Sequence, residues 1–277
     1  MGNIDKNIIR LKEFDSLDLQ QIQNEVIHIA TTMTDALFEK YRNFIQSHDG
    51  RYINSDLMKM VFKIYSESQE NRAKYNLAVT NSAACLTNEF YIRTIKDRNI
   101  KRCIYVAGPY GAGKSFFTQS LFLAGVIPNN TVVYEGSITA PEFGRKVELA
   151  MKNGVKTEIV ILNPTLKLSL ENIKRRAQET GRDVIKSEVV EKYADMYSNI
   201  EKLFGYLKSN FPELQTSKYP ISFQIYNKSS NLPEDLSVSY NINDLQHGSR
   251  QEISEEYDLI IKQLNSPSLE NDNGRTV

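Results

Sequence analysis

One stretch of the chain decides its fold class: Gly108-Pro109-Tyr110-Gly111-Ala112-Gly113-Lys114-Ser115. It fits the pattern G-x-x-x-x-G-K-[ST], in which glycines let the backbone fold tightly around phosphate groups. The lysine reaches the β- and γ-phosphate oxygens, and the hydroxyl after it binds Mg²⁺. The sequence therefore predicts a loop that binds ATP, with Lys114 as a catalytic cation and Ser115 as a ligand of Mg²⁺.

The residues on both sides of this loop have the patterns that a phosphate site requires. The apolar run 103–107 precedes it as a predicted buried strand, and residues 116–123 follow as an amphipathic helix. The first N–H groups of that helix would point at a bound anion, so Phe116 belongs to the predicted ATP site. The alternative is a glycine-rich turn that only joins a strand to a helix. Strand, loop and helix together favour the phosphate site.

Strand and helix patterns alternate along much of the chain. Short apolar runs predict further strands at 51–54, 131–135, 157–162 and 221–226, with helical stretches between them. Such alternation is typical of a parallel sheet covered by helices on both faces. Together with the phosphate loop, it predicts an α/β fold of the P-loop kinase class.

The chain divides into three parts. Residues 1–50 carry a long amphipathic pattern that begins after the capping residue Ser16 and has room for two helices. Residues 51–265 hold the alternating strands and helices. The tail 266–277, rich in Pro, Ser, Asn, Asp and Gly, is predicted to be disordered. We therefore expect a kinase domain with an N-terminal helical extension.

The composition narrows the possible partners. The 34 basic and 34 acidic residues cancel, which gives no electrostatic reason to expect nucleic acid or an anionic membrane as a partner. No apolar run approaches the roughly 18 residues that a membrane helix needs. Cys85 and Cys103 support neither a disulfide framework nor a zinc site. We expect a cytoplasmic protein with no nucleic-acid or membrane partner.

Polar residues follow three predicted strands, at the edge where parallel sheets bind ligands. Asp56 follows the first; its carboxylate can accept a proton from a substrate hydroxyl or position Mg²⁺, or else only cap a helix. Glu135-Gly136-Ser137 follows the strand after the loop, and a capped turn is the alternative there. Asn163-Pro164-Thr165 follows the next strand and can cap the helix behind it.

A basic cluster, Lys174-Arg175-Arg176, lies in the helical segment 166–207, which is interrupted only at Gly181. Kinases of this architecture bring arginines from a helical lid over the phosphates, because the phosphoryl transition state spreads charge over three oxygens. Arg175 and Arg182 are about two helical turns apart and share one face if the glycine does not break the helix. Both are predicted to be catalytic; the alternative is a solvated helix face.

These motifs resemble the zeta toxin family, the kinase halves of bacterial toxin and antitoxin pairs. The resemblance covers about residues 51 to 230 and rests on the loop, Glu135-Gly136-Ser137, Arg175, Gly181-Arg182 and the strand ending Tyr226-Asn227. It implies an adenylate-kinase-like core that transfers phosphate from ATP to an alcohol, the 3′-hydroxyl of a UDP-N-acetyl amino sugar such as UDP-N-acetylglucosamine. In such a pair an antitoxin protein would cover the nucleotide site. Residues 1–50 have no counterpart in the family's core, and their amphipathic pattern leaves two interpretations open: they cover the site in cis as an inhibitory arm, or they only complete the fold.

The resemblance also assigns roles, with the segments in a different order. Residues 51–56 and 81–89 match an aspartate strand and a substrate helix that follow the loop in the family but precede it here. Asp56 then matches the general base, and Glu89 a glutamate that binds the sugar nucleotide. Glu135 and Ser137 are assigned to the acceptor, and Asn227 to the vicinity of the adenine.

This rearrangement is physically possible. If the family order places the strand 131–135 between the strand 51–54 and the loop strand, both connections are right-handed parallel crossovers. One departure concerns the acceptor: the family commonly has an arginine where this chain has Thr139. Two other functions are therefore open, a kinase for another hydroxyl acceptor such as an antibiotic or a nucleotide, and a nucleotide-binding interaction protein without catalysis.

Overall fold

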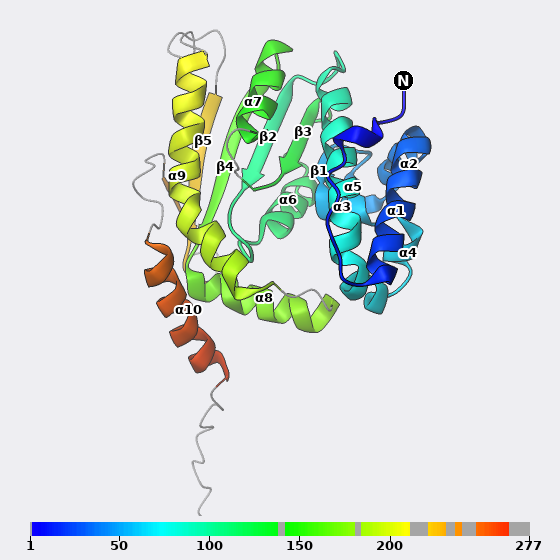
Figure 1. Ribbon diagram of the computed structural model, residues 1–277. Coiled ribbons are helices and arrows are strands. Elements are labelled where there is room, and N and C mark those ends of the chain that lie inside the picture. The colour runs from blue at the N-terminus through cyan, green and yellow to red at the C-terminus, as the bar shows by residue number, and fades with distance from the viewer. Residues whose placement is uncertain are drawn as a thin grey trace, which may run out of the picture.

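Six strands form one sheet in the order β1-β3-β2-β4-β5-β6. The computed structural model (Figure 1) describes residues 2–137, 142–180, 184–210, 221–230, 236–239 and 248–265. The strands are β1 (Tyr52–Asn54), β2 (Arg102–Ala107), β3 (Thr131–Glu135), β4 (Lys156–Pro164), β5 (Ile221–Lys228) and β6 (Leu236–Ser239). The first five are parallel and β6 is antiparallel to β5. The predicted α/β class is confirmed, and the antiparallel edge strand is an addition to it.

The position of β3 is the one considered for the rearranged segments. It lies between β1 and β2, with Glu135 in register with Asn54 on one side and Val106 on the other. Because carboxyl ends of parallel strands meet at one edge of a sheet, the segments that follow these three strands are brought together there.

Ten α-helices were assigned within the described residues. They are α1 (Leu17–Thr32), α2 (Thr34–Arg42), α3 (Ser55–Lys59), α4 (Lys63–Ser66), α5 (Gln69–Ile95), α6 (Lys114–Leu123), α7 (Glu142–Lys152), α8 (Leu166–Thr180), α9 (Lys186–Asn210) and α10 (Arg250–Asn265). Short 3₁₀ helices occur at η1 (Lys6–Ile8) and η2 (Ile45–Ser47). The predicted N-terminal helix is two helices, and Ser16 caps the first by accepting a bond from Leu19 N at 3.4 Å.

The sheet is packed on both faces because successive strand residues point to opposite sides. On one face, Cys103, Tyr105 and Ile159 belong to a large core with α5, α7 and α9. On the other face, Ile104 and Val106 belong to a smaller core with α6. The phosphate loop joins β2 to α6, and it is therefore fixed at both ends by buried apolar contacts.

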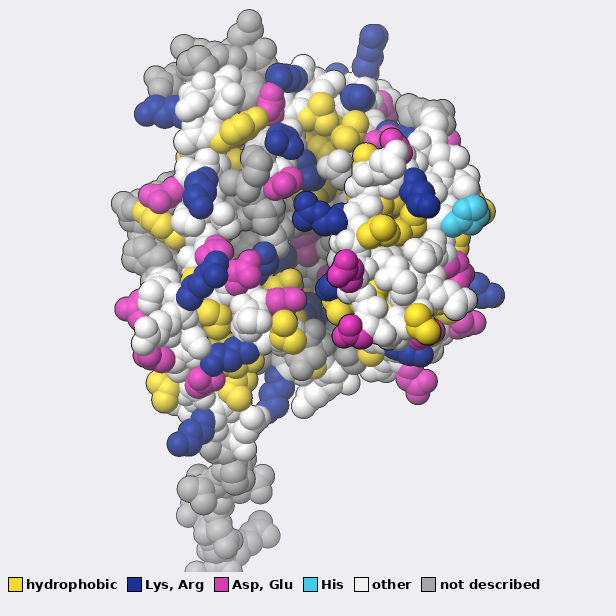
Figure 2. All heavy atoms as spheres, in the orientation of Figure 1, with side chains coloured by type: hydrophobic (Ala, Val, Ile, Leu, Met, Phe, Trp, Pro, Cys, Tyr) yellow, Lys and Arg dark blue, Asp and Glu magenta, His cyan; other side chains and the backbone are white. Residues whose placement is uncertain are grey.

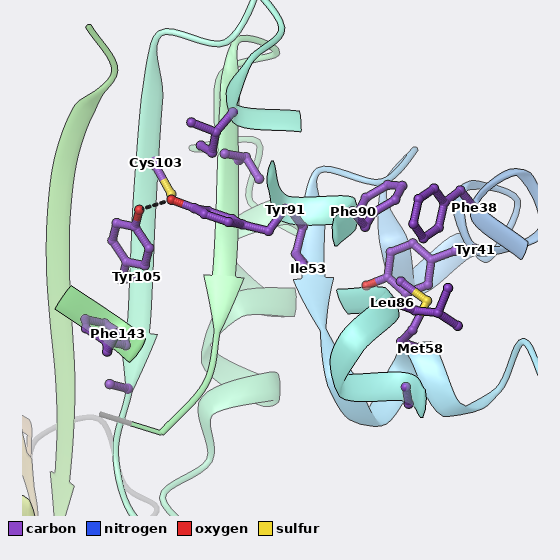
Figure 3. Close-up of a cluster of buried hydrophobic side chains, with 14 of the residues drawn as sticks. Phe38, Tyr41, Ile53, Met58, Leu86, Phe90, Tyr91, Cys103, Tyr105 and Phe143 are labelled. Atoms are coloured by element: carbon purple, nitrogen blue, oxygen red, sulfur yellow. Dashed lines mark hydrogen bonds between the residues drawn. The ribbon is translucent and has the colours of Figure 1, made fainter. Parts of the chain in front are cut away.

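The N-terminal helices share the larger core. The rings of Phe38 and Tyr41 each meet the ring of Phe90 on α5 edge to face, with centroids 5.1 Å apart in both pairs (Figure 3). Val26 and Ala30 of α1 are fully buried in the same core. Residues of the predicted extension thus pack as part of the α/β domain.

Helix α8 runs beneath the carboxyl ends of the strands (Figure 1). It forms a third apolar cluster with α9 and α10 that includes Leu166, Ile173, Tyr193, Ile253 and Ile260. The predicted interruption of the segment 166–207 is confirmed, since α8 ends at Thr180 and α9 begins at Lys186. The predicted tail 266–277 lies outside the described residues.

Acidic and basic side chains are interspersed over the face shown in Figure 2, in keeping with the zero net charge. None of the helices in the described part of the chain is long and apolar enough to cross a membrane.

Candidate functional site

A cavity of about 650 Å³ opens at the carboxyl ends of the strands. Its walls come from the phosphate loop, the ends of β1, β3, β4 and β5, and the helices α3, α5, α6 and α8. The predicted site residues that line it are Asp56, Tyr110, Gly111, Ala112, Gly113, Lys114, Ser115, Phe116, Glu135, Ser137 and Arg175. Gly108 and Pro109 complete the loop behind this wall, so the structure brings most of the predicted site together.

The loop takes a shape that its glycines make possible. Gly111 and Gly113 have φ angles of +74° and +79°, in the left-handed region that other residues rarely adopt. Gly113 stands at the start of α6, whose first turn receives no side-chain cap there. The free N–H groups and the positive end of the helix dipole favour an anion at this position.

Lys114 lies in the loop among acidic neighbours. Its Nζ donates to the carbonyl oxygens of Gly108 at 3.0 Å and Pro109 at 2.9 Å. Burial lowers the pKa of this ammonium, while the charges of Glu135 and Asp56 act in the opposite direction. These two carboxylates are thus close enough to act electrostatically on the predicted phosphate-binding cation.

Glu135 is bonded at both carboxylate oxygens. Ser115 Oγ donates to Oε1 at 3.1 Å, and the hydroxyl of Tyr52 donates to Oε2. Burial raises the pKa of the Glu135 carboxyl, and Lys114 opposes that shift. A hydroxyl beside a carboxylate fits Mg²⁺, which prefers oxygen ligands. Glu135 was predicted to bind the acceptor, whereas this contact puts it beside the predicted metal ligand.

Asp56 lies in the first turn of α3 without capping it. The cap is Asn54, whose Oδ1 accepts from Leu57 N at 2.8 Å, so the cap interpretation of Asp56 is wrong. The Asp56 carboxylate lines the cavity with 42% of its side chain exposed. Lys59 Nζ lies 3.2 Å from it, with a side chain only 7% exposed.

Helix α8 is attached to the loop by its polar face. Asn172 Nδ2 donates to the Gly111 carbonyl oxygen at 2.9 Å, and Arg175 Nη2 donates to Asn172 Oδ1 at 3.1 Å. Arg175 and Arg176 both line the cavity. The helix ends at Thr180, so the condition for a shared helical face, that Gly181 leaves the helix unbroken, is not met; Arg182 lies outside the described residues.

The arrangement is a glycine-rich loop at a helix N-terminus, facing polar groups from several elements across the cavity. No protein-family model matches the chain, and no curated protein matches it. The likeness to zeta toxins therefore rests on the motifs themselves.

Two predicted residues lie away from the cavity walls. Glu89 pairs with Arg93 Nε at 2.8 Å and lines a second hollow of about 470 Å³ between α5 and α7. Asn227 accepts from Asn163 Nδ2 at 2.6 Å, and Tyr226 lines the cavity in its place. Ala84 lines both hollows.

The cavity also contains residues that the sequence reasoning missed, among them Asn54, Lys59, Asn172, Arg176, Tyr226 and Lys228. The sequence could have indicated Arg176, because it stands in the same basic cluster as Arg175. It could also have indicated Tyr226, an aromatic residue near the carboxyl end of a predicted strand. The ring centroid of Tyr226 lies 5.2 Å from that of Phe117. Thr165 caps α8, because its hydroxyl oxygen accepts from Leu168 N at 3.3 Å; this confirms the helix cap predicted for the segment 163–165.

Proposed function

We propose that the protein is an ATP-dependent phosphotransferase with an alcohol group as acceptor. The observation that carries the proposal is the hydrogen bond between Ser115 and Glu135 inside the cavity lined by Lys114, Asp56 and Arg175. A phosphate loop alone serves many nucleotide-binding proteins. A carboxylate beside the loop hydroxyl supplies the second ligand that Mg²⁺-dependent phosphoryl transfer uses.

The loop and α6 hold the donor in this proposal. The triphosphate of ATP accepts hydrogen bonds from the loop amides. Lys114 Nζ, which donates to the carbonyl oxygens of Gly108 and Pro109 here, donates to phosphate oxygens instead when ATP is bound. Ser115 and Glu135 provide oxygen ligands for Mg²⁺, which neutralises charge on the β- and γ-phosphates when bound.

The acceptor enters from the side of α3 and α5. Its hydroxyl oxygen forms a bond to the γ-phosphorus while the bond from that phosphorus to the leaving ADP oxygen breaks. Asp56 accepts the hydroxyl proton, and Arg175 and Arg176 stabilise the charge on the transferring group. The Lys59 ammonium, 3.2 Å from the Asp56 carboxylate, holds that carboxylate at the cavity wall.

For the acceptor we propose a UDP-N-acetyl amino sugar such as UDP-N-acetylglucosamine, following the resemblance to zeta toxins. The strand order is compatible with the rearrangement on which that resemblance depends, because β3 lies between β1 and β2. Another hydroxyl acceptor is the second candidate. It is supported by the absence of Glu89, the predicted sugar-nucleotide ligand, from the described residues that line the cavity, where Lys59 and Thr80 are found instead. A cytoplasmic location belongs to the same proposal.

The test is a labelling experiment with the full chain. The protein, [γ-³²P]ATP and MgCl₂ are incubated with UDP-N-acetylglucosamine, other UDP-sugars, nucleosides and hydroxylated antibiotics, and products are separated by chromatography. We expect label in UDP-N-acetylglucosamine, and none with the Lys114→Ala variant. Tight ADP binding by calorimetry without labelled product from any acceptor would contradict the proposal and favour a non-catalytic interaction protein.

A further inference from the structure

A chain of hydrogen bonds joins the phosphate loop to helix α3. Ser115 donates to one oxygen of Glu135 at 3.1 Å, and the Tyr52 hydroxyl donates to the other oxygen. Asn54 Nδ2 donates to the Tyr52 hydroxyl at 3.0 Å, while Asn54 Oδ1 accepts from Leu57 N in the first turn of α3. The loop, the end of β3, strand β1 and α3 are therefore connected without a break.

The three side chains in the middle of this hydrogen-bond network are buried. Tyr52, Asn54 and Glu135 are 3%, 6% and 8% exposed. A buried polar group is costly when it lacks a partner, so each of these side chains is held to the one arrangement in which its bonds are made. With Oε2 held by Tyr52, the other oxygen of Glu135 is directed to Ser115.

The backbone of Tyr52 is held as well. Val133 N donates to Arg51 O at 2.7 Å, so the neighbouring carbonyl of Tyr52 faces away from β3. Tyr41 of α2 donates from its hydroxyl to that carbonyl at 2.7 Å and accepts from Asn54 N at 3.0 Å. The Tyr41 hydroxyl thus satisfies groups that an edge strand would otherwise leave unpaired.

We propose that Tyr52 is a positioning residue for metal-dependent phosphoryl transfer. It holds one oxygen of Glu135 so that the other stays beside Ser115. Through Asn54 it also fixes α3, and with it Asp56, relative to the same carboxylate. The inference rests on the proposed function, because it takes Glu135 and Ser115 as the groups that hold Mg²⁺. Residues that orient metal ligands in this way commonly change metal affinity when they are replaced.

The alternative is that Tyr52 only packs. Its ring belongs to the apolar cluster with Ile104 and Val133, and a packing role needs no hydroxyl. Tyr52→Phe separates the two roles because it keeps the ring and removes both hydrogen bonds of the hydroxyl, to Glu135 and from Asn54. Tyr41→Phe is the matched control, since it also removes one buried tyrosine hydroxyl next to β1 but none that touches Glu135.

The measurement is the affinity of the full chain for ADP by calorimetry over a range of Mg²⁺ concentrations. For Tyr52→Phe we expect unchanged ADP affinity without Mg²⁺. The Mg²⁺ midpoint, the concentration at which half of the Mg²⁺-dependent increase in ADP affinity is reached, should rise about tenfold. Tyr41→Phe should lower the melting temperature and leave the Mg²⁺ midpoint unchanged. Asn54→Ser keeps a capping oxygen but loses the donor to Tyr52, and it should shift the midpoint in the same direction.

The outcomes separate this inference from the proposed function. An unchanged Mg²⁺ midpoint in Tyr52→Phe overturns the inference alone, and so does an equal shift in Tyr41→Phe. If Tyr52→Phe does not fold, Asn54→Ser decides, and an unchanged midpoint there overturns the inference. If the unaltered protein binds no ADP, or binds it without response to Mg²⁺, the proposed function itself is wrong.

Discussion

Gly111 of the phosphate loop lies directly against the backbone of Ser169 on α8, where a Cβ at the glycine would stand 2.3 Å from the serine carbonyl oxygen. The Asn172 side chain bonds to the same glycine at 2.9 Å. Helix α8 is therefore seated on the loop by backbone contact as well as by a side chain. Arg175 and Arg176 of the same helix line the cavity, and under the proposed function this seating would keep them in position for the transferring phosphoryl group.

Gly111→Ala should damage the nucleotide site. The new methyl group meets backbone atoms that cannot rotate away, at a position whose φ is +74°. Gly113→Ala is the matched control, because its φ is +79° but nothing lies within 4 Å of the added Cβ. We expect about 1–2 kcal/mol of destabilisation from the left-handed backbone in the control. Gly111→Ala should lower stability further and weaken ADP binding at least tenfold. Thermal unfolding and calorimetry check this, and equal effects at both glycines would contradict it.

Asp56→Asn should remove transfer while sparing nucleotide binding. The amide cannot take the acceptor proton, and general-base catalysis is worth roughly 10²- to 10⁴-fold. We expect kcat to fall by that factor with unchanged ADP affinity. Asp18→Asn is the control, since Asp18 pairs with Lys74 on the surface and lines no part of the cavity among the described residues. Transfer by the Asp56 variant at the normal rate would show that the base is another group.

Arg176→Ala should slow transfer more than it weakens ATP binding. A cation that acts on the transferring phosphoryl group contributes mainly in the transition state, so kcat falls while KM changes little. We expect a loss of about 10²-fold or more, by analogy with other electrostatic contributors. Lys174→Ala is the neighbouring control, because its ammonium bonds to Leu264 O and Asn265 Oδ1 on α10. Equal losses in both variants would indicate a general effect on α8.

The parts of the site that sequence could predict are those encoded locally. The loop at 108–115 carries its glycines, lysine and hydroxyl in one short stretch, and the apolar run before it marks the strand. Asp56 was singled out because it stands just behind a strand, where a helix cap and a base have the same local pattern. The bond from Leu57 N to Asn54 Oδ1 identifies Asn54 as the cap, and the role of Asp56 as a base stays a prediction.

The missed parts depend on contacts between distant segments. Tyr52 and Glu135 are 83 residues apart in the chain and meet because β1 and β3 are neighbours in the sheet. Local pattern carries no information on such pairs, since the register of two strands is set by the whole sheet. Glu89 shows the reverse case: its helix was predicted, but its helical face directs it to Arg93 and the second hollow.

One interpretation of residues 1–50 is an inhibitory arm that covers the cavity. Within the described range 2–50, none of the residues lines the cavity, so α1 and α2 do not cover it. They contact the site's scaffold instead. His48 stacks on Phe122 of α6 with ring centroids 4.0 Å apart and bonds to Gln119 at 2.7 Å, and Tyr41 holds β1. We therefore expect these helices to support the α/β domain.

Phe38→Ala tests that expectation without deleting any segment. The Phe38 side chain is buried against Phe90 and under the guanidinium of Arg93, and removing a buried phenyl ring costs about 3–5 kcal/mol. We expect a lower melting temperature and no gain in ATP turnover. Leu17→Ala, at a side chain 88% exposed on α1, should change stability by less than about 0.5 kcal/mol. An inhibitory arm predicts the opposite for Phe38→Ala, because a loosened arm would release the site and raise turnover.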